Sequence, residues 1–310
     1  MQFLVSLKQV VIIFILMIIG FICKKADFIH EITVKDLTNL LLYVVSPCLI
    51  INSFIMPFSQ KQFKMFLLAL GVSILVFIIN ILLADLFFQR KHFKNHQQLV
   101  ILRYSTVYSN AGFMGIPLVQ VFLGTRGVFF STPFLIVYNL LMWSHGIHLF
   151  KNNHDNILTQ LKKLLINLNI IAAIVGMVIY LLQFKLPVII HMPMHYLASV
   201  NTPLSMIVIG SNLSQISLRE IFNDRLCWLG TLVRNIIVPC CTLMVLQLFA
   251  LNNLARMAII IMISCPVAGV VVLFSILNNY DTKFPIKLLC LSTSCAVITI
   301  PLLIWLAMLI

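Results

Sequence analysis

The chain has 310 residues, of which 61% are hydrophobic and 9% are charged, and its mean hydropathy is +1.08. No soluble core could bury that much apolar surface, so the composition excludes an ordinary soluble domain and indicates an integral membrane protein. The net charge of +13 does not indicate nucleic-acid binding, because the basic residues lie between apolar runs and form no folded polar face.

Ten apolar runs follow one another along the chain. They occupy residues 10–23, 37–56, 66–88, 104–123, 128–150, 164–183, 193–213, 226–251, 255–277 and 286–310. At about 20 residues per crossing, these runs predict an all-α integral membrane protein with ten transmembrane helices and short loops. The first run ends in Lys24 and Lys25 without a small-residue cleavage site, so we interpret it as a retained span.

The loops after odd-numbered runs hold most of the basic residues. These are Lys24, Lys25, Lys35, Arg90, Lys91, Lys94, Arg103, Lys151, Lys162, Lys163, Arg219, Arg225, Lys283 and Lys287. The loops after even-numbered runs hold Lys61, Lys64, Arg126, Lys185 and Arg256. The positive-inside rule therefore predicts a multi-pass protein of the cell membrane whose termini both lie outside.

Glycine and polar residues interrupt the fourth run at residues 108–118, whose sequence is YSNAGFMGIPL. Hydrocarbon offers no hydrogen-bond partners, so such a break is tolerated only against protein or a wet cavity. A second interruption, at residues 264–269, lies at the corresponding place in the ninth run. Paired broken helices are typical of secondary transporters that bind their substrate near the membrane midplane.

The two breaks supply most of the candidate substrate-binding residues. Asn110 and Ser264 offer polar side chains, and Gly112 and Gly115 allow close backbone approach. Half-helix N-termini that meet there would present free N–H groups and partial positive charge to an anion. We therefore predict a site that accepts a carboxylate.

The two halves of the chain, residues 1–155 and 156–310, repeat weakly. A shift of 156 positions superposes Gly20 on Gly176 and Pro47 on Pro203. Because each half holds five runs, an odd number, the second half would be inserted upside down relative to the first. This predicts two inverted five-helix repeats with broken fourth and ninth helices.

Four prolines are candidate helix breaks. We expect Pro117 and Pro266 to hold the fourth and ninth runs open. Pro47 and Pro203 would bend the second and seventh runs, because proline removes a backbone donor and clashes with the preceding turn. For these last two, a purely structural kink is the alternative.

Charges inside the runs are few. Arg234 lies about two turns inside the eighth run and should face protein or water. It could hold a substrate carboxylate bidentately, form a structural contact between helices, or snorkel towards the headgroups. Near the end of the third run, Asp85 is expected to form a boundary ion pair with Arg103 or Arg90.

Two amides, Asn80 and Asn139, lie in the middle of apolar runs and need hydrogen-bond partners. Either could line a substrate path, and we include Asn139 among the candidate substrate-binding residues. Hydrogen bonding between neighbouring helices is the alternative for both.

The sequence predicts neither an enzyme nor a metalloprotein. The pairs His145 and His148, and His191 and His195, have helical spacing but lack the Glu of a metalloprotease motif or a carboxylate cluster. The eight cysteines lie in or beside apolar runs without zinc spacing. The chain also lacks a GxxxxGK phosphate-binding loop, so we predict no cofactor and no direct ATP drive.

Three segments resemble the auxin efflux carrier family: NAGFMGIPL at 110–118, LTNLLLYVVSPCL at 37–49 and LVRNIIVP at 232–239. The resemblance implies a fold shared with PIN auxin carriers and bile acid:sodium symporters, with a scaffold and a transport domain. It also implies a substrate site where the fourth and ninth helices cross, with Asn110, Pro117 and Pro266 at matching positions. The long central loop of plant carriers is absent, since only residues 151–163 join the halves. Compact bacterial members that resemble this form include permeases for malate and malonate.

We therefore predict a secondary transporter of small organic anions, mono- or dicarboxylates such as malate, that works by alternating access. Its partners would be the anion, the lipid bilayer, and H⁺ or Na⁺ as a coupling ion, and the sequence is compatible with a homodimer. The alternative is a membrane-embedded sensor that binds a small ligand without moving it.

Overall fold

The computed structural model describes residues 2–150, 167–214 and 224–309, with side chains described from Val11 onward. In these ranges the chain is helical, and no β-strand is present beyond one isolated bridge. The predicted junction of the halves at residues 155 and 156 lies outside the described residues, as do the segment 151–163 and Arg219.

Helices occupy the first five apolar runs and the turns beside them. In chain order they are α1 (Gln2–Lys25), α2 (Glu31–Leu40), η1 (Leu41–Val45), α3 (Ser46–Phe54), α4 (Gln60–Phe87), η2 (Arg90–His92), α5 (His96–Val107), η3 (Ala111–Gly115), α6 (Ile116–Leu141), η4 (Met142–Gly146) and α7 (Ile147–Phe150). The helix α6 bends sharply at Gly124, whose φ is 65°. It therefore includes the end of the fourth apolar run and most of the fifth.

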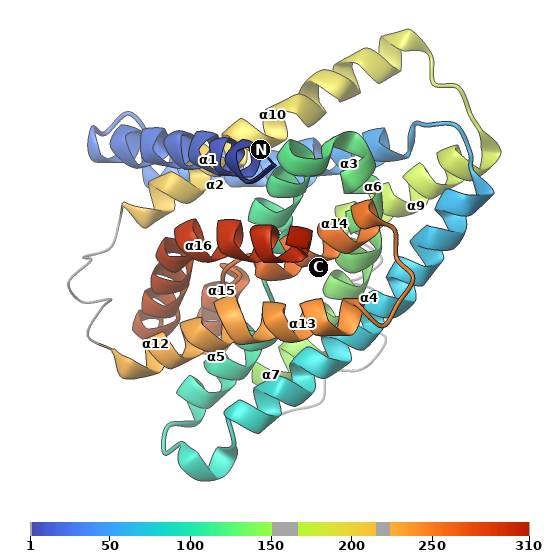
Figure 1. The fold of residues 1–310 in the computed structure, drawn as a ribbon. Helices are drawn as coiled ribbons and strands as arrows, with labels where there is room; N and C mark the ends of the chain where they lie inside the picture. The colour runs from blue at the N-terminus through green and yellow to red at the C-terminus, as the bar shows by residue number, and fades with distance from the viewer. Residues whose placement is uncertain (1, 151–166, 215–223, 310) are drawn as a thin grey trace.

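The later runs are helical as well. Their helices are α9 (Leu168–Leu182), α10 (Val188–Leu213), α12 (Arg225–Leu232), η5 (Val233–Ile237), α13 (Val238–Leu246), α14 (Asn253–Ser264), α15 (Val270–Leu277) and α16 (Lys283–Leu309). Figure 1 shows α1, α2 and α10 lying together along one side, while α12, α13 and α16 lie on another.

Asparagine and aspartate side chains begin four of the helices that start in loops. The side chains of Asn95, Asn167, Asp224 and Asn252 accept hydrogen bonds from backbone N–H groups of α5, α9, α12 and α14. Each such cap stabilises a helix start by about 1 kcal/mol. The starts of these helices are therefore determined by the capping residue directly before each helix.

Three π-helical turns each end two residues before a proline. The turn η1 precedes Pro47, η3 precedes Pro117 and η5 precedes Pro239. In an α-helix the proline ring clashes with the carbonyl four residues earlier, and a wider π turn makes room for it. Pro203 instead lies inside the continuous helix α10, and the bend predicted there stays a prediction.

Small residues bring α1 and α10 into close contact. A Cβ atom added to Gly20 would collide with the backbone of Ile207, and one added to Gly210 would collide with the backbone of Met17. The Ser211 hydroxyl also donates to the Gly20 carbonyl oxygen at 3.0 Å. Glycine at a helix contact lets two backbones approach, as is common in membrane bundles.

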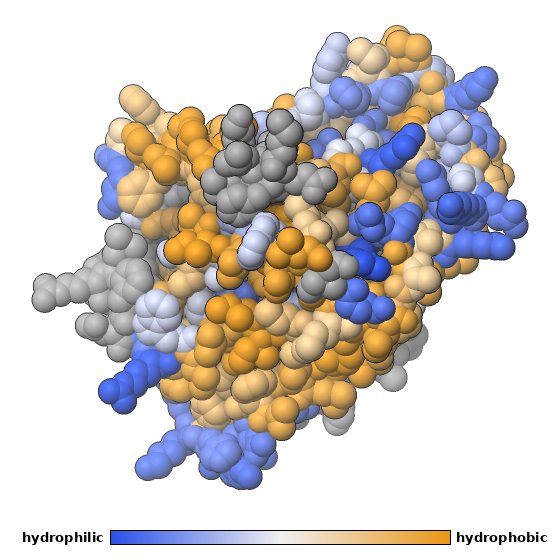
Figure 2. Space-filling view, viewed as in Figure 1, coloured by the Kyte–Doolittle hydropathy of each residue, from blue (hydrophilic) through white to orange (hydrophobic). Residues whose placement is uncertain are grey.

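The outer surface carries many apolar side chains. Within the described residues, five helical segments are long and apolar enough to cross a membrane: Glu31–Phe54, Gln60–His92, Ala111–Phe150, Arg225–Leu246 and Lys283–Leu309. Large side chains such as Ile18, Leu86 and Ile298 are more than half exposed. Figure 2 shows a broad hydrophobic face with hydrophilic side chains gathered at its ends. Such a surface suits lipid rather than water, so the all-helical structure is compatible with a multi-pass membrane protein.

Candidate functional site

Both predicted interruptions contain a break in helix, but the first break is shorter than expected, because residues 111–118 lie in η3 and α6. The helix α5 ends at Val107, and residues 108–110 are not helical before η3 begins. The helix α14 ends at Ser264, and residues 265–269 separate it from α15. The break residues are buried except for Asn110, which is half-buried, and Gly269, which is exposed.

The two breaks lie side by side and bond to each other through their backbones. The Asn110 N–H donates to the Pro266 carbonyl oxygen at 2.7 Å, and the Ala268 N–H donates to the Tyr108 carbonyl oxygen at 3.3 Å. Ser109 and Val267 form an isolated antiparallel bridge between these bonds. We call residues 108–110 and 265–268 the crossing. Its backbone bonds satisfy polar groups that the broken helices leave without partners.

Arg234 is fully buried against the crossing. Its Nη1 donates to the Thr106 carbonyl oxygen at 2.8 Å, its Nε to the Cys265 carbonyl oxygen at 3.2 Å, and its Nη2 to the Ile263 carbonyl oxygen. These carbonyls end α5 and α14, where helix carbonyls lack intrahelical partners and carry partial negative charge. The guanidinium has five N–H donors, and three of them therefore hold the two helix ends.

The next residue, Asn235, holds the second break from another direction. Its Nδ2 donates to the Ser292 carbonyl oxygen at 2.8 Å, and its Oδ1 accepts from the Ser292 hydroxyl at 2.7 Å. The same hydroxyl oxygen accepts from the Val267 N–H at 3.0 Å. Asn235, Ser292 and Thr106 were not among the site residues predicted from the sequence. The position of Asn235 directly after Arg234 is the signal that could have found it.

Three serine hydroxyls in or near the crossing have no hydrogen-bond partner among the described residues. Ser105, Ser109 and Ser264 are buried, and their Oγ atoms make no hydrogen bond within the described part of the chain. The side chain of Asn110 also has no hydrogen-bond partner among the described residues. Buried hydroxyls are normally bonded, so these groups are available to water or to a ligand.

The two candidate glycines differ. A Cβ atom on Gly115 would come within 2.7 Å of the Met262 sulfur, so this glycine allows η3 to pack closely on α14. A Cβ atom on Gly112 would meet nothing within 4 Å. Close approach to protein is therefore present at Gly115, whereas Gly112 faces open space, and the contact of either glycine with substrate stays a prediction.

Asn139 has protein partners on both amide atoms. Its Nδ2 donates to the Leu135 carbonyl oxygen at 2.8 Å, and its Oδ1 accepts from Asn167 at 3.1 Å. Asn167 also begins α9. This bonding between helices is the alternative that the sequence left open for Asn139.

Residues 5–304 match the family model described as membrane transport protein. The chain belongs to this family. It is the auxin efflux carrier family that the three motifs predicted. An uncharacterized transporter of Methanocaldococcus jannaschii is 24% identical over 319 residues, which cover 97% of this chain and 99% of that relative. The protein is therefore a membrane transporter and not an enzyme.

In this membrane transporter, each of the three family motifs forms a π turn followed by a proline. The first motif forms one side of the crossing through η3, and the third carries Arg234 and Asn235 in η5. The second motif forms η1 and the start of α3. Phe113 of η3 packs against the small core cluster that contains Val45 and Val208, so η3, which follows the crossing directly, adjoins η1 and α10.

Two further polar contacts involve Tyr108 and the helix α5 that leads into the crossing. The Tyr108 hydroxyl donates to the Leu141 carbonyl oxygen at 2.8 Å and lies 2.9 Å from His145 Nδ1. Asp85 and Arg103 form an ion pair at 3.0 Å, which confirms the boundary pair predicted for Asp85.

Within the described residues, no group of three or more His, Cys, Asp or Glu side chains could hold a metal ion.

Proposed function

We propose that this transporter moves a small organic anion, a mono- or dicarboxylate such as malate, by alternating access. The observation that carries the proposal is the pair of uncapped helix starts at the crossing. The helices that begin at η3 and α15 have no side-chain cap, whereas α5 and α14, which lead into the breaks, begin at capping asparagines. Free N–H groups and partial positive charge at two helix starts suit a carboxylate.

Asn110 would bind the anion directly, because its side chain is half-buried and unpartnered beside one of these helix starts. Ser109 and Ser264 would add hydroxyl donors. Arg234 would contribute positive charge through the N–H groups that make no protein bond, while its other donors hold the helix ends. A substrate contact at Asn139 is less well supported, because both its amide atoms already have partners.

We further infer ten transmembrane helices in two inverted repeats. In the predicted repeat, the first run corresponds to the sixth and the second to the seventh. The helix α1 of the first run packs on α10 of the seventh, and α9 of the sixth run packs on α3 of the second. This exchange of partners supports the repeat, as does the crossing of the fourth and ninth runs. The basic odd-numbered loops support termini that both lie outside.

The test is uptake and binding of labelled malate and related carboxylates by the purified protein in proteoliposomes. Asn110→Leu should abolish both, because it replaces a polar contact with an apolar side chain that the bilayer accepts. The matched control is Asn212→Leu, which makes the same change at an exposed position in α10. Normal binding and uptake in Asn110→Leu would remove the crossing from the proposal. Binding without uptake by the unaltered protein would indicate the sensor instead.

A further inference from the structure

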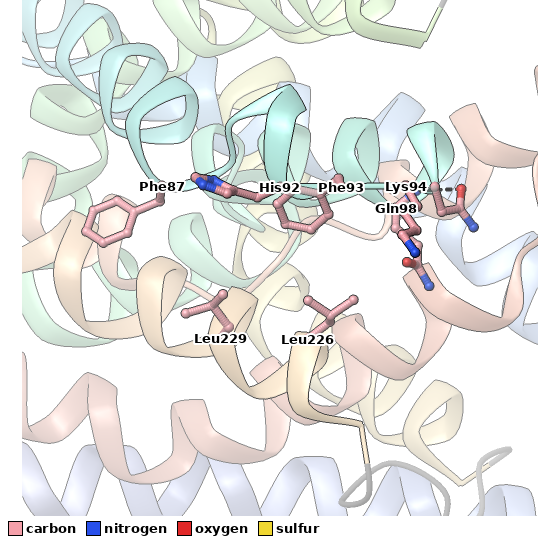
Figure 3. Close-up of a pocket in the computed structure, with 8 residues that line it drawn as sticks. Phe87, His92, Phe93, Lys94, Gln98, Leu226 and Leu229 are labelled. Atoms are coloured by element: carbon pink, nitrogen blue, oxygen red, sulfur yellow. Dashed lines mark hydrogen bonds between the residues drawn. The ribbon is translucent and has the colours of Figure 1, made fainter.

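A cavity of about 490 Å³ lies between the α4–α5 connection and α12. Eight residues line it: Phe87, His92, Phe93, Lys94, Asn95, Gln98, Leu226 and Leu229. Figure 3 shows the α4–α5 residues along one side and the two leucines across from them. We call it the α4–α12 cavity. None of its lining residues belongs to the crossing.

The α4–α12 cavity has an apolar wall that continues onto the lipid-facing surface. Phe87 and Leu229 line the cavity and are themselves exposed. Beyond them, Leu86 on α4 and Leu232 on α12 are large exposed apolar side chains. An acyl chain on this surface could therefore enter the cavity without leaving an apolar environment.

The α4–α5 side of the cavity also carries basic side chains. Lys94 and His92 line the cavity and are exposed, and Arg90 and Lys91 occupy the turn η2 beside them. In Figure 2 hydrophilic side chains gather at the lower tip, where Figure 1 places the α4–α5 connection.

The nearby carboxylates are already engaged. Asp85 pairs with Arg103, Asp224 accepts from the first turn of α12, and Asp281 accepts from the Lys283 N–H. Within the described residues, none of the three cations at positions 90, 91 and 94 forms an ion pair. The cavity therefore lies between basic side chains that have no ion-pair partner among the described residues and an apolar surface.

We propose that the α4–α12 cavity binds an anionic phospholipid. Its phosphate would contact Lys94 and His92, and an acyl chain would lie along Phe87 and Leu229. Charge complementarity selects an anionic over a zwitterionic headgroup, since basic pockets between membrane helices attract anionic lipids. This inference is independent of the substrate proposed above.

The experiment counts lipids that remain bound to the detergent-purified protein by native mass spectrometry. The protein is first reconstituted in vesicles of phosphatidylglycerol and phosphatidylcholine. The unaltered protein should retain phosphatidylglycerol selectively. Lys94→Gln should lower the affinity by about fivefold, the effect of one lysine near a membrane surface. Lys185→Gln is the control, because it removes the same charge from an exposed loop residue elsewhere.

Two further variants distinguish a specific loss of the lipid site from a change in net charge and from misfolding. Leu229→Trp should displace the lipid by filling the cavity without changing charge, and Leu302→Trp at an exposed position in α16 should not. Lys94→Arg should retain the lipid. Equal loss in Lys94→Gln and Lys185→Gln would overturn the proposal. Displacement of the lipid by millimolar inorganic phosphate would also overturn it, since the site would then bind a free anion.

Discussion

Arg234 illustrates how a membrane interior can hold a buried charge. An unpaired guanidinium in hydrocarbon is costly, but the carbonyls of Thr106, Ile263 and Cys265 supply partial negative charge at the ends of two helices. Of the roles that the sequence left open, a structural contact between helices is visible directly in these bonds. The proposed counter-charge for the substrate would use the remaining donors.

We expect Arg234→Gln to lower both the melting temperature and the substrate affinity. Glutamine is shorter and uncharged, so buried carbonyls lose their donors at about 1–3 kcal/mol for each unsatisfied group. Arg234→Lys should recover only part of the lost stability and affinity, because a single ammonium group cannot reproduce the planar array of donors of a guanidinium. Thermal unfolding and ligand titration measure the two effects, with the exposed Arg126→Gln as control. A loss of affinity at unchanged melting temperature would show that Arg234 is only a substrate ligand.

Ser264→Ala should lower the substrate affinity without lowering the melting temperature. The Ser264 hydroxyl is buried and has no partner in the described part of the chain, so its removal should leave the melting temperature unchanged or slightly higher. Substrate affinity should fall if the hydroxyl contacts the anion. Ser275→Ala is the control, because that hydroxyl donates to the Val271 carbonyl oxygen at 2.8 Å. Unchanged affinity in Ser264→Ala would exclude this hydroxyl from the site.

At the scale of elements, helix contacts depend on where glycine lies. Gly210 meets the α1 backbone, whereas Gly71 in α4 has no neighbour within 4 Å of an added Cβ atom. A backbone neighbour cannot move aside as a flexible side chain can. The same substitution should therefore have opposite effects at the two positions.

Gly210→Ala should destabilise the protein by about 1–3 kcal/mol or more, the cost of overpacking a close contact. Gly71→Ala should be neutral or stabilising by up to about 1 kcal/mol, because alanine favours helix. Thermal unfolding of the two purified variants measures the difference. Equal melting temperatures would contradict the α1–α10 packing.

Pro117→Ala should slow uptake more than it weakens binding. Alanine restores a backbone donor after the π turn η3, so the wide turn is no longer required and η3 can become regular α-helix continuous with α6. Pro301→Ala, inside the α-helix α16 away from any π turn, is the control. Uptake rates and dissociation constants from the same proteoliposomes test this. A loss of binding larger than the loss of rate would argue that Pro117 shapes the anion site itself.

At the scale of the whole molecule, the charge of the loops predicts orientation. A single cysteine at the exposed Lys91, in a cysteine-free background, should resist a membrane-impermeant thiol reagent in intact cells. A single cysteine at the exposed Lys185 should react. The reverse pattern would place both termini in the cytoplasm.

The sequence by itself determined the features that depend on local composition. Apolar runs set where the helices lie, asparagine and aspartate set several of their starts, and stretches rich in polar residues, glycine and proline mark the neighbourhood of the two breaks. It also indicated the family, because the three motifs are local. Each of these features follows from side-chain properties within a few residues of chain.

Only the tertiary structure decided which distant groups meet. Arg234 bonds to carbonyls 29, 31 and 128 positions away in the chain, and Asn235 reaches Ser292 across 57 positions. Nothing local distinguishes an arginine that binds substrate from one that holds helix ends. The same limit applied to Asn139, which bonds to Asn167, and to Gly112, which faces open space. Hydropathy places a residue inside the membrane, but the partner of a buried polar group depends on how the helices pack.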